Sequence, residues 1–192
     1  MGRRRRPRGK PKGASTQTPS TGNSPRIAAV PPARPLAPAL SAQPDPADLY
    51  AALDLGTNSC RMLIAQPKGN HLHVVDSFSK SVQLGLGLES SGRLSRQSMA
   101  RTVSALKICK RKLQRRDVKR MRLVATEACR RASNAAEFIA VVHRETGLAL
   151  EIIEPEEEAR LAVVACAPLV SARTEQLLVV DIGGGSTELV WI

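Results

Sequence analysis

The stretch that decides the fold is residues 178–192, LVVDIGGGSTELVWI, because residues 51–65, AALDLGTNSCRMLIA, are a weaker copy of it. Aligned without a gap, the two stretches agree at three positions: Asp181 falls on Asp54, Gly183 on Gly56 and Ser186 on Ser59. Apolar residues flank the polar turn in both stretches. Each is therefore predicted to form a strand, a tight turn and a second strand. The repetition predicts two phosphate-holding hairpins from a duplicated domain.

The first 47 residues differ in composition from the rest of the chain. The chain has 192 residues and a net charge of +12, and this segment holds nine Lys or Arg, one acid, ten of the thirteen prolines and no aromatic residue. Such a composition cannot bury enough apolar surface to fold, so residues 1–47 are predicted to be a disordered basic tail. The run RRRRPRGK at residues 3–10 could contact RNA, acidic lipid or polyphosphate by charge alone, or could serve only as a solubilising tail.

The sequence shows no targeting or membrane segment. Prolines interrupt the amphipathic helix that an organelle transit peptide would need, and no apolar run approaches the length of a membrane span. We therefore expect a cytoplasmic protein without membrane contact. The four cysteines form no Cys-x-x-Cys pair, which argues against a zinc knuckle or a redox motif and favours reduced, mostly buried thiols.

The folded region is predicted to begin near Asp48. Apolar runs bounded by turn residues predict strands at 49–54, 60–66, 72–82, 122–125, 150–153 and 176–181. Helical spacing predicts helices from an N-cap at Ser95 to about Arg116, at about 134–145, and from Pro155 towards Pro168. This order predicts an α/β layered domain over residues 48–172, followed by the first hairpin of a second, truncated domain over residues 173–192. The basic face of the 95–116 helix is typical of a solvated surface, with a groove for a polyanion as the alternative.

The turns carry groups suited to phosphate and to a metal ion. The run Gly183-Gly184-Gly185 leaves backbone N–H groups unobstructed, so it can wrap an anionic oxygen, and Ser186 and Thr187 add hydroxyl donors. The Lys of a Walker loop and the last Gly of a Rossmann fingerprint are both missing. Asp54 and Asp181 end their predicted strands, where two carboxylates suit a hydrated Mg²⁺, although either could simply cap its own turn.

Glu158 is the candidate general base for an attacking water. A carboxylate within one hydrogen bond of that water can deprotonate it in line with the leaving oxygen. The crowded triplet of residues 156–158 should raise the proton affinity of one of its members, although the same triplet also suits a solvated helix start. The role of Arg130 is similarly open, because its guanidinium could pair with an acid or bind a phosphate.

Four ordered segments carry a family resemblance. They are AALDLGTNS at 51–59, TEACRRASN at 126–134, EEEARL at 156–161 and VDIGGGSTE at 180–188. Together they resemble the exopolyphosphatase and guanosine pentaphosphate phosphohydrolase family over residues 49–192. The resemblance implies an actin-like ATPase fold, made of two ribonuclease H-like domains of which the first is complete here and the second only begun. It also implies Mg²⁺-dependent release of terminal phosphate from polyphosphate, or of the 5′ γ-phosphate from guanosine pentaphosphate, and a homodimer.

The same resemblance implies a role for each motif residue. Glu158, Asp181 and Glu188 look catalytic, and Asp54, Asp181 and Glu188 look like the Mg²⁺ ligands. The phosphate contacts that it implies are Asp54, Gly56, Thr57, Asn58, Ser59, Arg130, Gly183, Gly184, Gly185, Ser186 and Thr187. Pro155 stands where family members often have Gly, which stiffens the entry to the Glu158 helix. If 192 residues are the whole product, hydrolysis should be weak or absent.

Two other readings share these features. One is a catalytically inactive, truncated module that binds polyphosphate or RNA through its basic segments, in which case binding should weaken steeply with salt. The other is an ATP-dependent sugar kinase or actin relative with the same fold, which the Glu158 motif disfavours because it fits water activation better. The sequence does not choose between polyphosphate and guanosine pentaphosphate.

Overall fold

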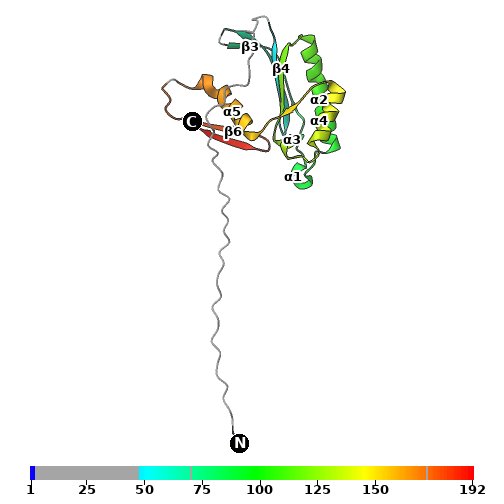
Figure 1. Ribbon diagram of the computed structural model, residues 1–192, viewed down its shortest axis with the longest axis vertical. Coiled ribbons are helices and arrows are strands. Elements are labelled where there is room, and N and C mark those ends of the chain that lie inside the picture. Colours follow the sequence, from blue (N-terminus) through cyan, green and yellow to red (C-terminus); the bar gives the residue numbers. More distant parts are fainter. Residues whose placement is uncertain (3–47, 70, 172) are drawn as a thin grey trace.

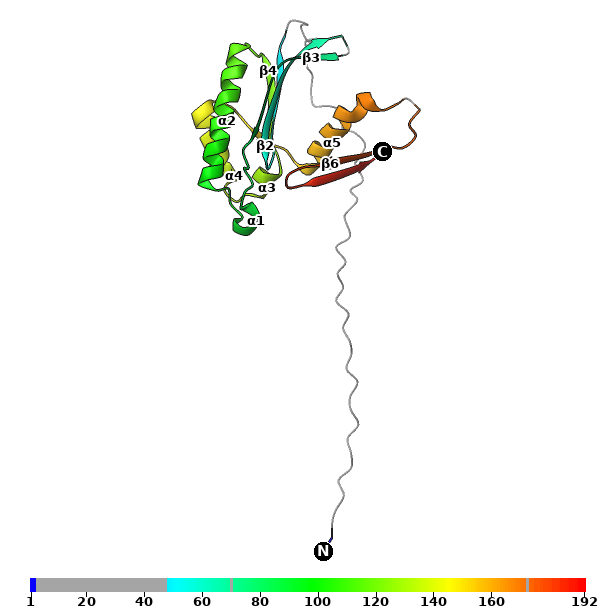
Figure 2. The same ribbon diagram turned by 180° about the vertical axis from the view of Figure 1, so that it is seen from behind.

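The structure, a computed structural model, describes residues 1–2, 48–69, 71–171 and 173–192. The tail predicted for residues 1–47 therefore lies, apart from its first two residues, outside the described residues. The described part contains a five-stranded mixed sheet, helices on both of its faces and a separate two-stranded hairpin (Figures 1 and 2). The predicted α/β class is confirmed.

The main sheet has the strand order β3-β2-β1-β4-β5. Its strands are β1 Tyr50–Leu55, β2 Ser59–Lys68, β3 His71–Ser81, β4 Arg120–Ala125 and β5 Glu151–Ile152. The first three form an antiparallel meander, while β4 pairs parallel to β1 and β5 pairs parallel to β4. The carboxyl ends of β1, β4 and β5 therefore meet at one edge of the sheet, where α/β proteins place their ligands.

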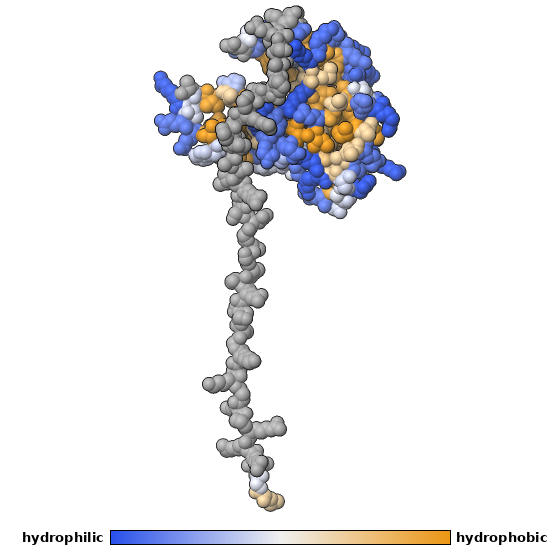
Figure 3. Space-filling view, viewed as in Figure 1, coloured by the Kyte–Doolittle hydropathy of each residue, from blue (hydrophilic) through white to orange (hydrophobic). Residues whose placement is uncertain are grey.

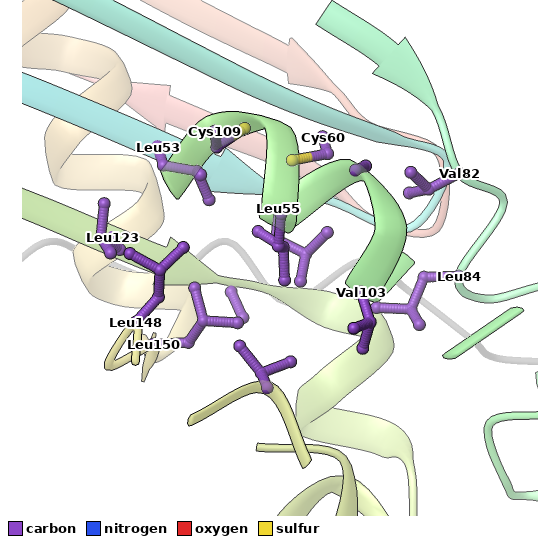
Figure 4. Packing of buried hydrophobic residues seen from close by; sticks show 14 of the residues in the cluster. Leu53, Leu55, Cys60, Val82, Leu84, Val103, Cys109, Leu123, Leu148 and Leu150 are labelled. Carbon is purple, nitrogen blue, oxygen red and sulfur yellow. The ribbon is translucent and has the colours of Figure 1, made fainter. Parts of the chain in front are cut away.

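Alternation along the strands fixes which face of the sheet is buried. Ala51, Leu53 and Leu55 of β1 are buried, while Ala52 and Asp54 between them are exposed. The buried side chains point towards α2, Arg96–Arg115, and α4, Ala135–Thr146, which cover the same face (Figure 2). Figure 4 shows the resulting cluster between the strands and α2. Each fully buried leucine there contributes roughly 1.5–3 kcal/mol.

The other face of the sheet carries a smaller layer. It contains α5, Pro155–Cys166, the 3₁₀ turn Ala167–Leu169, and a hairpin of β6, Leu178–Ile182, with β7, Thr187–Trp191. The helix α5 packs against both strands of this hairpin. Val179 and Val190 are buried beneath α5, whereas Leu178, Leu189 and Trp191 on the other face are more than half exposed. Apolar residues are visible among polar ones on this lobe in Figure 3.

Most predicted elements are present with small shifts of their ends. Ser95 caps α2 as predicted, because its Oγ accepts a hydrogen bond of 3.1 Å from the Ser98 N–H. Two short helices were not predicted, α1 at Leu88–Ser91 and α3 at Glu127–Arg131. The strand expected at 150–153 has only two residues, Glu151–Ile152. Among the described residues, no helix has the length and apolar character that crossing a membrane would require.

Candidate active site

The two turns that the sequence repeats have the same local geometry. In the first turn the Gly56 N–H donates to the Ser59 carbonyl at 3.0 Å. In the second turn the Gly183 N–H donates to the Ser186 carbonyl at 2.9 Å. Each turn joins antiparallel strands, β1 with β2 and β6 with β7. The internal repeat in the sequence is thus also a repeat in hydrogen bonding.

The two turns lie against each other, although more than 120 residues separate them in sequence. A Cβ atom placed on Gly184 would lie 2.6 Å from Nδ2 of Asn58, and one on Gly185 would lie 2.8 Å from Oγ1 of Thr57. A side chain at either position would therefore require Asn58 or Thr57 to shift, so glycine allows the close approach. Both turns, with Glu127 of α3, line a pocket of about 400 Å³. The sequence predicted the two turns, and the structure brings them together.

Four predicted carboxylates gather behind these turns. Burial raises the pKa of Asp54, and the negative charges of Glu158 and Asp181 raise it further, whereas the positive charge of Arg61 lowers it. The Asp54 residue nevertheless keeps a solvent-accessible side. Burial also raises the pKa of Glu188, whereas a hydrogen bond from Ser186 lowers it. The negative charges of Glu158 and Asp181 add to the increase. Asp181 and Glu188 are directly paired across the hairpin. The site therefore concentrates negative charge, with Arg61 and Arg130 as nearby cations.

Arg130 is the cation that contacts the candidate base. Its Nη1 donates to Oε2 of Glu158 at 2.8 Å and to the carbonyl of Ile153 at 2.8 Å. Its Nη2 donates to Oε2 of Glu127 at 3.1 Å. The side chains of Arg130 and Glu158 are only 10% and 19% exposed, so this pair is largely shielded from water. Arg130 thus pairs with two acids in the structure, and its role as a phosphate contact remains a prediction.

A family model and several solved structures match the chain. The model of the Ppx/GppA phosphatase family matches residues 63–192. The chain belongs to this family. A Ppx/GppA family member from Aquifex aeolicus is 41% identical with a TM-score of 0.67, over 75% of this chain and 47% of that one. An exopolyphosphatase from Cytophaga hutchinsonii is 27% identical with a TM-score of 0.69, over 75% of this chain and 46% of that one.

The comparison with Ppx/GppA structures confirms the predicted family and the actin-like α/β fold. A type II variant of the Aquifex aeolicus phosphatase also matches, at 37% identity with a TM-score of 0.65, over 76% of this chain and 52% of that one. The chain thus spans about half the length of the solved relatives that it matches.

The carboxylates suit a magnesium ion held jointly with a substrate. Within the described ranges, no group of three or more Asp, Glu, His or Cys side chains is placed to hold a metal ion by itself. Mg²⁺ in proteins usually takes one or two carboxylates and completes its shell with water and substrate phosphates. Burial is the main cause of the raised pKa values of Asp54 and Glu188, and neighbouring carboxylates add to it, so a bound cation would favour the ionised forms of both groups. Asp54, Asp181 and Glu188 as ligands of such an ion remain a prediction.

The sequence reasoning missed the residues that hold the helix of the candidate base. Glu127 bridges Arg130 and, at 3.7 Å, Arg131. Its spacing of three and four residues from these arginines is a helical signal that was available. Arg122 of β4 donates to Glu157 at 2.8 Å and to Glu151 at 3.0 Å, across 35 and 29 residues. No local pattern reveals such distant partners.

Proposed function

We propose that this chain hydrolyses phosphoanhydride bonds, with a terminal phosphate held between its two turns and water activated by Glu158. The substrates that fit are inorganic polyphosphate, losing its terminal phosphate, and guanosine pentaphosphate, losing its 5′ γ-phosphate. The observation that carries the proposal is the contact between the turns at Asn58 and Gly184, with four carboxylates gathered beside it. Membership of the Ppx/GppA phosphatase family supports the same class of reaction.

The turns supply the phosphate contacts. Backbone N–H groups of a glycine-rich turn can point at anionic oxygens without obstruction by side chains. Gly184 and Gly185 line the same pocket as Thr57 and Asn58. Two turns approaching from different elements would hold a phosphate from opposite sides. Gly56, Ser59, Ser186 and Thr187 belong to the same turns and complete the proposed contacts.

Glu158 would position the attacking water. Its Oε2 accepts the bond from Arg130, while Oε1 has no hydrogen-bond partner among the described residues. That oxygen is therefore available to accept a hydrogen bond from an attacking water. The bond from Arg130 fixes the orientation of the carboxylate. The candidate base thus has one oxygen for its support and one for its chemistry.

A cation is needed because the site is acidic and the substrate is a polyanion. Asp54, Asp181, Glu158 and Glu188 would repel a phosphate chain in the absence of a counter-charge. Mg²⁺, when bound, would neutralise charge between these carboxylates and the phosphate oxygens. Asp181 and Glu188 would share its coordination with Asp54.

The test is phosphate release by the full 192-residue chain from long-chain polyphosphate, and separately from guanosine pentaphosphate, with and without Mg²⁺. We expect Mg²⁺-dependent release, weak for these 192 residues alone, that Glu158→Gln abolishes. Glutamine keeps an oxygen for Arg130, so the fold should persist. The matched control is Glu156→Gln, because Glu156 is exposed and forms no ion pair within the described part of the chain. A wild-type chain that binds polyphosphate but releases none would instead identify the inactive binding module.

The homodimer and the contact of the basic tail with a polyanion remain predictions. Sedimentation of the full chain would test the first. Salt dependence of polyphosphate binding, compared between the full chain and a variant with the run at residues 3–10 neutralised, would test the second.

A further inference from the structure

The segment after β3 is bonded to the first turn. The N–H groups of Val82 and Gln83 both donate to the carbonyl of Asn58, at 2.8 and 2.9 Å. The N–H of Gly85 donates to the carbonyl of Thr57 at 3.0 Å. Residues 82–85 thus give three hydrogen bonds to the two residues that face the second turn.

The backbone of Gln83 is in the unfavourable left-handed conformation where it forms these bonds. Its φ is +47°, and among the described residues only Asp117 is another non-glycine residue with positive φ. This left-handed region brings Cβ close to the backbone and is rarely adopted by residues with a long side chain. Such conformations persist where the surroundings determine them, and they are concentrated at functional sites.

Arg101 of α2 holds the strained segment from the other side. Its Nε donates to the carbonyl of Val82 at 3.0 Å, and its Nη2 donates to the carbonyl of Gln83 at 3.2 Å. The same Nη2 donates to Oγ of Ser98 at 3.0 Å, one turn earlier on the helix. A planar guanidinium can donate to two successive carbonyls in this way, because its N–H groups point in fixed directions. The single ammonium group of a lysine does not reproduce this arrangement of donors.

Side-chain packing continues the connection to the cleft. A Cβ on Gly85 would lie 2.4 Å from Cγ2 of Thr57, so the segment and the turn are in tight contact. Thr57 in turn approaches Gly185 of the second turn. Contacts therefore run from Arg101 through residues 82–85 and the first turn to the face of the second turn.

We propose that Arg101 is a positioning residue for phosphate binding. It keeps Gln83 in its left-handed conformation, and residues 82–85 then set the place of Thr57 and Asn58 opposite the glycine-rich turn. The effect on catalysis rests on the proposed function, whereas the effect on the backbone does not. Arg101 does not itself line the pocket between the turns.

The experiment compares Arg101→Gln, Arg101→Lys and Gln83→Gly with the double variant Arg101→Gln/Gln83→Gly. Amide hydrogen exchange of residues 82–85 reports the backbone, and steady-state kinetics with polyphosphate reports the site. We expect Arg101→Gln to speed exchange of these amides roughly tenfold, with little change elsewhere. KM should rise several-fold and kcat should change less, with Lys recovering only part of the loss. Arg96→Gln is the matched control, because Arg96 lies exposed on the same helix.

The glycine variant tests the strain. Glycine adopts positive φ without a steric cost, so loss of Arg101 should speed exchange less in the Gln83→Gly background than in the wild type. If loss of Arg101 sped exchange equally in both backgrounds, Arg101 would not act by holding Gln83 in its left-handed conformation. If amide exchange at residues 82–85 were no faster in Arg101→Gln than in Arg96→Gln, the positioning role would be overturned. The same holds if Arg101→Gln sped exchange evenly over the whole chain. Faster local exchange in a chain that releases no phosphate would refute the proposed function and leave the positioning role standing.

Discussion

The anchoring of α5 gives a prediction whose size can be worked out. Glu157 accepts hydrogen bonds from Nε and Nη2 of Arg160, at 2.6 and 3.0 Å, and from Nη1 of Arg122 at 2.8 Å. Arg122 also forms a two-point contact with Glu151. Since α5 has no fully buried side chain, this network is a main connection between the helix and the sheet. We predict that Glu157→Gln destabilises the chain measurably.

The pKa of Glu157 sets the upper limit of the effect. The pKa of Glu157 is lowered from an ordinary 4.5 to about 2. The hydrogen bond from Arg160 is the largest cause, burial opposes the decrease, and the bond from Arg122 adds to the decrease. At about 1.4 kcal/mol per pKa unit, the linkage would give about 3 kcal/mol at neutral pH. The side chains of Glu157, Arg160 and Arg122 are 28%, 33% and 42% exposed, so solvent screening reduces the expected loss to about 1–1.5 kcal/mol. This corresponds to about 2–6 °C in Tm for a chain of this size.

Urea unfolding at several pH values measures the difference. Because the folded-state pKa of Glu157 is depressed, its stabilisation is complete above about pH 5 and is lost as the pH falls towards 2. The gap between wild type and Glu157→Gln should therefore close over this range. Glu156→Gln is the control, since Glu156 is the exposed neighbour of Glu157 and lacks these bonds. Equal stability of the two variants at pH 7, or a gap that is independent of pH, would refute the reasoning.

Two further predictions concern the cleft. Gly184→Ala should raise KM for polyphosphate about three- to tenfold in steady-state assays, with little change in Tm, because its Cβ would collide with Asn58 and separate two exposed turns. Asp181→Asn should lower the pKa values of both Asp54 and Glu188 in a carboxyl NMR titration, because it removes a negative charge that raises both of them. Unchanged titration of both groups would show that the three carboxylates do not interact.

The sequence was most informative where the structure is local. A turn between two apolar strands is specified by neighbouring residues, so the hairpins at Asp54 and Asp181 could be found from their repeated pattern. The long amphipathic helix and its cap at Ser95 could be found for the same reason. Two short helices were missed because four or five residues contain too little of a helical period to recognise, as at Leu88–Ser91.

The sequence was least informative about which residues support the site. Arg130 meets Glu158 across 28 residues, and Arg101 meets Val82 across 19. Such pairs depend on how α2, α3 and α5 pack on the sheet, which no local pattern encodes. The motif residues were identified because they repeat or resemble a family, whereas Arg101 stood out only as part of the basic face of the 95–116 helix, which gave no sign of its bonds to Val82 and Gln83.

The two sides of the cleft are supported differently, and this separates their expected kinetic effects. The first turn is held by residues 82–85 and through them by Arg101, whereas Glu158 is held by Arg130 and by the anchoring of α5 through Glu157. Loss of Arg101 should therefore weaken phosphate binding and raise KM. Loss of the Glu157 anchor should displace the base and lower kcat, because a small misplacement of a catalytic group slows the reaction. If the two variants changed KM and kcat in the same proportion, the cleft would respond as a single unit rather than as two independently supported walls.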